Sequence, residues 1–335
     1  MNDLIMPAAL ELRLLNDYQH DFPLEPEPFA SIAAQLGAEQ TEVLQLLNSL
    51  QQQGTVSRVG AVFRPRSIGA STLAALAVPE DKLDEVAQMV SSYPEVNHNY
   101  QREHHFNLWF VAAAPDEVAL QRTLKEIEER SGCKVLCLPL VEDYHIDLGF
   151  DMTGCKPKSA VFIESHAGAP RLPYLPSEQE NRLISAIQSG LPLVERPYRA
   201  VGEKAGLSEN EVIAGMRKLI RLGVIKRMGV VVRHHEMGYR ANAMVVWDIP
   251  DDEVSRLGVC LGKLEYVTLC YRRPRRLPFW RYNLFCMIHG HDREEVLARV
   301  EEMRQGCGLQ HIACEVLFST RRFKQCGARY ARQAA

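Results

Sequence analysis

The sequence contains one long internal repeat, and this repeat limits the possible folds more than any other feature. Matched segments recur at a nearly constant spacing until a basic insertion lengthens the second copy. The matched pairs are Phe22-Pro23-Leu24 with Leu191-Pro192-Leu193, residues 58–62 with 227–231, Tyr100 with Tyr271, Arg102 with Arg273, and Phe106-Asn107-Leu108 with Tyr282-Asn283-Leu284. A repeat of this length indicates a duplicated domain and not a solenoid unit.

Length and composition agree with a duplicated globular protein. A chain of 335 residues is too long for one small core. Its net charge of -3 provides no general basic field for nucleic acid. The nine cysteines form no C-x-x-C pair, so we expect neither structural zinc nor a disulfide framework. We expect a cytoplasmic location, and no stretch approaches the roughly 20 apolar residues of a membrane span.

Each copy begins with a pattern typical of a winged helix-turn-helix. In the first copy, apolar residues at helical spacing predict helices over 3–19, 28–36 and 39–52. The strand-like segment 56–63 follows them. Three short helices leading into a β-hairpin describe this motif.

A β-α-β-β-α-β pattern follows in each copy, which predicts a ferredoxin-like domain. In the first copy the expected strands and helices are 72–78, 80–92, 96–102, 106–112, 116–130 and 134–140. In the second copy they are 241–249, 251–262, 266–272, 282–289, 292–304 and 310–318.

The predicted fold class is therefore α+β, a tandem duplication whose two halves pair as a pseudo-dimer within one chain. The expected domains are an N-terminal helix with the first winged helix-turn-helix (1–63), the first ferredoxin-like domain (64–150), a linker rich in Pro, Gly and Ser (151–180), the second winged helix-turn-helix (181–232) and the second ferredoxin-like domain (233–330).

Residues 96–111 carry the most distinctive chemistry in the chain. If the segment is extended, His98, Tyr100, Arg102 and His104 lie on one face. Such a row is poor material for a dry core, but it suits an anionic ligand that must also receive a proton. The alternative is a set of solvated histidines on an edge strand. The matching stretch 267–290 in the second copy favours the ligand site.

A winged helix-turn-helix before a ferredoxin-like domain is the layout of the Lrp/AsnC transcription regulators, so DNA binding was considered first. The first predicted recognition helix, 39–52, contains no Lys or Arg, and acidic residues surround it. DNA affinity depends on neutralising phosphates, so this helix would repel a duplex. Lys218 and Arg221 leave weak contact by the second half open, but we do not expect DNA as a partner.

The sequence resembles the siroheme decarboxylase family, in the fused form with two Lrp-like subunits on one chain. The most specific motifs are 193–198, 238–247, 270–274 and 280–285 in the second half, and 98–100, 107–109 and 145–150 in the first. The resemblance implies removal of the C12 and C18 acetate carboxyls of siroheme, giving 12,18-didecarboxysiroheme for heme d1 biosynthesis. The alternative is an Lrp/AsnC-type transcription regulator that responds to a tetrapyrrole or another ligand.

Siroheme carries eight carboxylates around a flat ring, so its site needs cations and aromatic faces. The basic loop of the second copy, residues 272–281, supplies both cations and aromatic rings. The alternatives are a solvated basic loop or a nucleic-acid patch. The expected substrate-binding residues are Arg102, Asn107, Trp109, Tyr271, Arg272, Arg273, Arg275, Arg276, Trp280, Tyr282 and Asn283.

The expected catalytic residues are His98, His104 and Tyr100, with one histidine donating the proton that completes the methyl group. His98 aligns with Leu269, so the first half is expected to supply the acid while the second half's arginines grip the substrate. The protonated tetrapyrrole can serve as the electron sink, so we expect no cofactor and no metal site, because the iron arrives within siroheme. The implied partners are siroheme and its decarboxylated products, in a cleft between the halves; a second protein of the same family and self-association are left open, and no membrane contact is expected.

Overall fold

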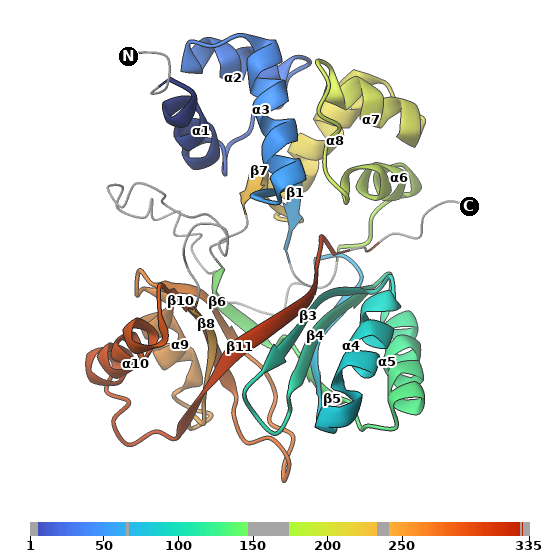
Figure 1. The fold of residues 1–335 in the computed structure, drawn as a ribbon. Coiled ribbons are helices and arrows are strands. Elements are labelled where there is room, and N and C mark those ends of the chain that lie inside the picture. Colours follow the sequence, from blue (N-terminus) through green and yellow to red (C-terminus); the bar gives the residue numbers. More distant parts are fainter. Residues whose placement is uncertain (1–5, 65–66, 147–173, 233–240, 329, 331–335) are drawn as a thin grey trace. The chain divides into compact units, whose positions relative to one another are not determined.

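The computed structural model describes residues 6–64, 67–146, 174–232, 241–328 and 330, which form two compact units. The winged-helix unit comprises Met1–Ile68, Gly149–Met237 and Arg329–Ala335, and the sheet unit comprises Gly69–Leu148 and Gly238–Ala328. Each unit therefore takes one part from each copy of the repeat (Figure 1). The predicted duplication and the α+β fold class are confirmed. Most of the predicted linker, residues 151–173, lies outside the described residues.

The winged-helix unit contains two helical triplets and one two-stranded ribbon. Its elements are α1 (Met6–Asp17), α2 (Pro28–Leu36), α3 (Gln40–Gln53), β1 (Val56–Phe63), α6 (Glu178–Ile187), α7 (Pro197–Ala205), α8 (Glu209–Arg221) and β7 (Ile225–Val232). Proline at the first turn starts α2 and α7, and a capping box starts α3, α6 and α8.

The expected β-hairpin in each copy is wrong. Within the described part of the chain, β1 pairs antiparallel with β7 of the other copy, with Gly60 opposite Gly229. Each copy therefore contributes one strand to the ribbon. The prediction failed because the sequence pattern of a strand does not indicate which other strand it pairs with. Both triplets and the ribbon share one apolar core.

The sheet unit contains the two predicted β-α-β-β-α-β modules. The first comprises β2 (Ala70–Leu76), η1 (Glu80–Lys82), α4 (Leu83–Ser92), β3 (Val96–Arg102), β4 (Leu108–Ala114), α5 (Glu117–Ser131), β5 (Leu136–Pro139) and β6 (Glu142–Ile146). The second comprises β8 (Ala241–Trp247), α9 (Val254–Gly262), β9 (Val267–Arg272), β10 (Leu284–Gly290), α10 (Arg293–Cys307) and β11 (Cys314–Gln325).

The two modules exchange strands and form one nine-stranded sheet in the order β5-β2-β4-β3-β11-β8-β10-β9-β6. The first part of β11 pairs with β8 of its own module, and its second part pairs with β3 of the other (Figure 1). In return, β6 leaves the first module and pairs with β9. The predicted strand over 310–318 was therefore too short, and β6 was not predicted, because both extensions find their partners in the other copy.

The sheet must curve back on itself. Its two outermost strands, β5 and β6, are separated in the chain only by Leu140 and Val141. Eight strand spacings would cover about 38 Å in a flat sheet, whereas so short a connection spans about 10 Å. The helices cover one face of each module over its own apolar core. The other face contributes to a third core, built from both modules.

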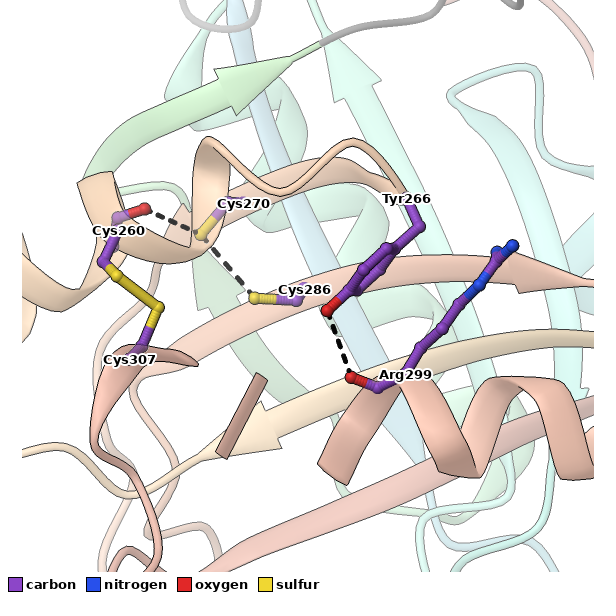
Figure 2. The surroundings of a disulfide bond; sticks show 7 residues. Cys260, Tyr266, Cys270, Cys286, Arg299 and Cys307 are labelled. Atoms are coloured by element: carbon purple, nitrogen blue, oxygen red, sulfur yellow. Dashed lines mark hydrogen bonds between the residues drawn. A yellow bond between two sulfur atoms is a disulfide. The ribbon is translucent and has the colours of Figure 1, made fainter. Parts of the chain in front are cut away.

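One disulfide in the second module contradicts the expectation from cysteine spacing. Cys260 in α9 is bonded to Cys307 at the end of α10, and the buried thiols of Cys270 and Cys286 lie next to each other with 3.6 Å between their sulfur atoms (Figure 2). The bonded cysteines are 47 residues apart and come together only when the two helices pack, so no short sequence motif predicts this disulfide.

We expect the docking of β6 to depend on Gly258 of α9. A Cβ at this position would lie 2.2 Å from the ring of Tyr144 in β6, well inside contact distance. Gly258→Ala should lower the free energy of unfolding by about 1–3 kcal/mol, because an overpacked contact outweighs the gain in helix propensity. Urea unfolding measures this.

The matched control is Gly306→Ala in α10, where a Cβ would meet nothing within 4 Å. That variant should be neutral or gain up to about 1 kcal/mol. Equal behaviour of the two variants would contradict the proposed dependence of β6 docking on Gly258.

Candidate functional site

The helix-free face of β3 carries three of the predicted site residues. The imidazole of His98 stacks on the ring of Tyr100 with 6.3 Å between centroids, and the Arg102 guanidinium lies 5.8 Å from the same ring. Asn99, one position along from Tyr100, points the other way and donates to the Ala87 carbonyl of α4. The alternation of an extended strand therefore places the three residues together, as predicted for this segment.

A pseudo-equivalent arrangement occurs on β9 and the residue after it. The Arg273 guanidinium lies 5.3 Å from the ring centroid of Tyr271 and donates to the carbonyl of Leu138 at 2.6 Å. Arg102 donates in the same way to the carbonyl of Leu317 at 2.9 Å. The match between the two Tyr-x-Arg motifs in sequence thus extends to their contacts.

Arg102 and Arg273 differ from the three arginines of the basic loop that contact carboxylates. In the described part of the chain, neither forms a salt bridge with a carboxylate, and the buried Nε atom of each has no hydrogen-bond partner. Burial lowers the pKa of Arg102 and of Arg273 to about 10, so both stay charged at neutral pH. A buried cation without an anion costs free energy, and an anionic ligand would recover it.

Three other arginines of the basic loop contact carboxylates. Arg275 donates to Asp248 and Asp251, and Arg281 donates to the second oxygen of Asp248 at 2.7 Å. Burial alone would raise the pKa of Asp248, but the hydrogen bonds from these two arginines hold it below its ordinary value. Arg272 lies 3.6 Å from Asp251. Arg272, Arg275 and Arg281 thus have carboxylate partners, which lie in the connection between β8 and α9.

Arg276 is exposed and donates through Nε to the carbonyl of Cys137 at 3.0 Å. It thus lies beside the last strand of the first module, but outside the core shared by the two modules. Among the loop's arginines, Arg273 has the surroundings that best suit a buried carboxylate.

The predicted aromatic residues gather in the core shared by the two modules. Trp280 is 1 % exposed and packs against Trp109, Tyr282, Phe106 and Phe285 with centroid distances of 5.1–6.1 Å. Trp109 donates its indole N–H to the Phe106 carbonyl. These rings form a wall beside the polar residues of β3.

Asn107 and Asn283 occupy equivalent structural positions. The side chain of Asn107 accepts from the Val78 N–H and donates to the Val78 carbonyl. Asn283 makes the same pair of bonds with Ile249. Both amides are thus occupied in fixing the backbone that follows β2 and β8, and they are left out of the site proposed below.

His104 was predicted on the same strand face, but β3 ends at Arg102, so His104 lies in the turn before β4. Its Nδ1 accepts from the Phe106 N–H at 2.9 Å, and its Nε2 lies 2.9 Å from a carboxylate oxygen of Glu315. The other oxygen of Glu315 accepts from the Tyr282 hydroxyl at 2.7 Å. Glu315 was not predicted as a site residue, because it lies in β11 far from any recognisable motif. Its position beside β8 follows only from the strand pairing.

Within the described ranges, no group of three or more His, Cys, Asp or Glu side chains could hold a metal ion. The described helices also include none that is both long and apolar enough to cross a membrane.

The fold and these residues define a class: a duplicated protein of the AsnC ligand-binding type, with an equivalent Tyr-x-Arg arrangement in each copy whose arginine contacts the other copy. Two family profiles match the chain. A profile described as "AsnC-like ligand binding domain" matches residues 67–145 and 236–324, and one described as "Siroheme decarboxylase NirDL-like HTH domain" matches 11–56 and 180–226.

Known proteins support the same assignment. The siroheme decarboxylase NirDL subunit of Paracoccus denitrificans is 44% identical over 326 residues, covering 97% of this chain and 98% of the relative. The siroheme decarboxylase NirD subunit of Pseudomonas aeruginosa is 51% identical over 143 residues, covering 43% of this chain and 95% of the relative. A crystal structure of siroheme decarboxylase NirDL in co-complex with an iron-uroporphyrin III analogue superposes with a TM-score of 0.68 at 31% identity, covering 96% of this chain and 93% of that one. The chain belongs to the siroheme decarboxylase family.

We expect a structural effect when Asn283 is truncated. Asn283→Ala leaves the buried N–H and carbonyl of Ile249 without their side-chain partners, so it should lower the free energy of unfolding by about 2–3 kcal/mol. Asn107→Ala should behave similarly, and the exposed Asn48→Ala serves as the control. Urea denaturation measures the change. Full stability combined with weaker ligand binding would contradict the structural role.

Proposed function

We propose that this chain decarboxylates siroheme, removing the C12 and C18 acetate carboxyls to give 12,18-didecarboxysiroheme for heme d1 biosynthesis. The observation that carries the proposal is the pair Arg102 and Arg273, whose Nε atoms are buried and which lack carboxylate partners in the described chain. Each lies against a tyrosine ring on the helix-free side of the sheet. A polycarboxylate with a flat ring complements both features. The name of the co-crystallised NirDL relative supports a ligand of this class.

In the proposed mechanism, Arg102 and Arg273 bind carboxylates of the substrate, and the wall around Trp280 excludes water from the ring. Loss of CO2 breaks a carbon–carbon bond, and its electron pair moves toward the protonated macrocycle. A histidine of the first half, His98 or His104, then supplies the proton that forms the methyl C–H bond, with Tyr100 beside it. The substrate's own ring accepts the electrons, so we propose that no cofactor besides the substrate iron takes part.

Anaerobic incubation of the purified chain with siroheme, followed by mass spectrometry, tests the activity. We expect the tetrapyrrole to lose the mass of CO2 once and then twice. The double variant His98→Ala, His104→Ala should bind siroheme but give no mass loss, because both candidate proton donors are gone. Binding by the unaltered chain without any mass loss would overturn the decarboxylase. Full activity of the double variant would overturn only the assignment of the acid.

A second prediction concerns the buried arginines. Arg102→Met and Arg273→Met should each weaken siroheme binding by about 1.5–3 kcal/mol, the contribution of a charged hydrogen bond. Without ligand, the change in stability should be small, because removing a cation that lacks an anion offsets the loss of its hydrogen bond to a backbone carbonyl.

Spectroscopic titration and urea unfolding measure the two quantities, with the exposed Arg256→Met as control. Unchanged siroheme affinity in both variants would move the proposed site elsewhere.

A ligand-responsive transcription regulator is the competing function, because the winged-helix unit retains two helix-turn-helix modules. Its surface offers little support: α3 contains no Lys or Arg, and on α8 the Lys218 ammonium lies 2.8 Å from Glu180. Hydrogen bonds from Lys218, Ser177 and Tyr174 overcome burial and lower the pKa of Glu180 to about 2. Titration of a promoter fragment across a salt series separates the two functions, since a regulator would show a steep slope from phosphate contacts.

A further inference from the structure

The two pseudo-equivalent sites of the sheet unit differ in their ionisable residues. On β3, His98 and Tyr100 precede Arg102, whereas on β9 the residue that matches His98 is Leu269. A second difference lies on the neighbouring strands. Glu315 of β11 is opposite Val246, and the residue at the same register in the first module, opposite Ala75, is Leu136. The site with the histidine thus has a carboxylate where the other site has leucine.

We infer that Glu315 is a positioning residue for His104, contributed by the second copy to the proton-donating site of the first. This inference rests on the proposed decarboxylation. The Phe106 N–H donates to Nδ1 of His104, so the ring proton lies on Nε2, and Glu315 accepts this proton and holds the ring in that orientation. The Tyr282 hydroxyl holds the second oxygen, so the carboxylate cannot easily rotate away.

Glu315 also sets how readily His104 takes up a second proton. A proton added at Nδ1 faces the Phe106 N–H, so the charged ring turns away from that amide while Nε2–H stays on Glu315. The Nδ1–H is then the proton that reaches the substrate carbon, and water restores it. A side-chain carboxylate that orients a histidine and stabilises its charged form is a general device in enzyme sites.

Several charged groups act on this cluster. Burial lowers the pKa of His104, His105 adds to the lowering, and Glu315 opposes both. Burial and the Glu315 carboxylate raise the pKa of Tyr282, so its hydroxyl stays protonated and remains a donor, while Arg281 acts in the opposite direction. Glu315 is therefore the principal group among the described residues that favours the imidazolium form of His104.

The test compares Glu315→Gln with the unaltered chain. The amide keeps the shape of the side chain and loses its charge, so the pKa of His104 should fall further. Because turnover needs the protonated ring, the loss of activity as pH rises should occur at lower pH in the variant. We expect kcat at neutral pH to fall about 10- to 100-fold, the usual effect of removing a histidine's supporting partner, with siroheme affinity unchanged.

Glu315→Asp keeps the charge and should restore part of the activity, and the exposed Glu129→Gln on α5 is the control. A structural role alone would lower stability without moving the pH profile. The inference is overturned if the Glu315→Gln profile coincides with that of the unaltered chain.

A second readout does not depend on turnover. Nitrogen-15 NMR of labelled histidines reports the tautomer and pKa of His104, assigned by its loss in His104→Gln. We expect the Nε2–H tautomer in the unaltered chain and a lower pKa of His104 in Glu315→Gln. An unchanged His104 signal in Glu315→Gln overturns the inference even if the chain proves inactive toward siroheme. A shifted signal in an inactive chain sustains the positioning role and overturns only the proposed function.

Discussion

The candidate site depends on one feature of backbone pairing, the passage of β11 from the sheet of one module to the sheet of the other. Its first part completes the second module beside β8, and its second part lies against β3. This strand supplies the Leu317 carbonyl that Arg102 binds, and it supplies Glu315 to His104. The reciprocal exchange of β6 closes the opposite edge. The exchange of β11 thus brings residues of the second copy into contact with Arg102 and His104 of the first.

The charges of the sheet unit divide into two groups with different physical roles. Arg275 and Arg281 form salt bridges with Asp248, and Arg275 also with Asp251, so the loop that follows β9 is tied to the connection that follows β8. Such partly exposed pairs hold the loop in shape and contribute modestly to stability. Among the described residues, Arg102 is buried and Arg273 half-buried, and their guanidinium groups contact backbone carbonyls, aromatic rings and, for Arg102, the sulfur of Met287. An uncompensated charge costs free energy that an anionic ligand can recover, so the absence of a counter-ion in the described part of the chain is more informative than the number of arginines.

Much of the fold could be predicted because local patterns carry it. The repeat predicted both modules, helical periodicity placed α2 and α3 nearly to the residue, and strand alternation placed His98, Tyr100 and Arg102 on one face. The missed features all depend on contacts between distant segments. The β1–β7 ribbon, the exchange of β6 and β11, and the Cys260–Cys307 bond join segments that no local pattern connects.

The candidate site shows the same limit. The sequence correctly indicated which residue types gather near β3, but it could not distinguish a compensated arginine from an uncompensated one, because the partners of Arg275 lie 24 and 27 positions away. Glu315 shows no signal of its own, since a single glutamate in a strand is ordinary at a solvated edge. Only the register of β11 against β8 brings it to His104.

The strand exchange also has a consequence for covalent architecture. Relatives such as the Pseudomonas aeruginosa NirD subunit match only half of this chain, so in those proteins the equivalent of one module is a separate polypeptide. Joining both modules on one chain makes their association unimolecular, and it then no longer depends on protein concentration. In this chain, the contact between His104 and Glu315 joins residues of different copies within one polypeptide, and the two copies are necessarily present in equal amounts. Joining the two copies on one chain thus keeps them at a one-to-one ratio and close to each other.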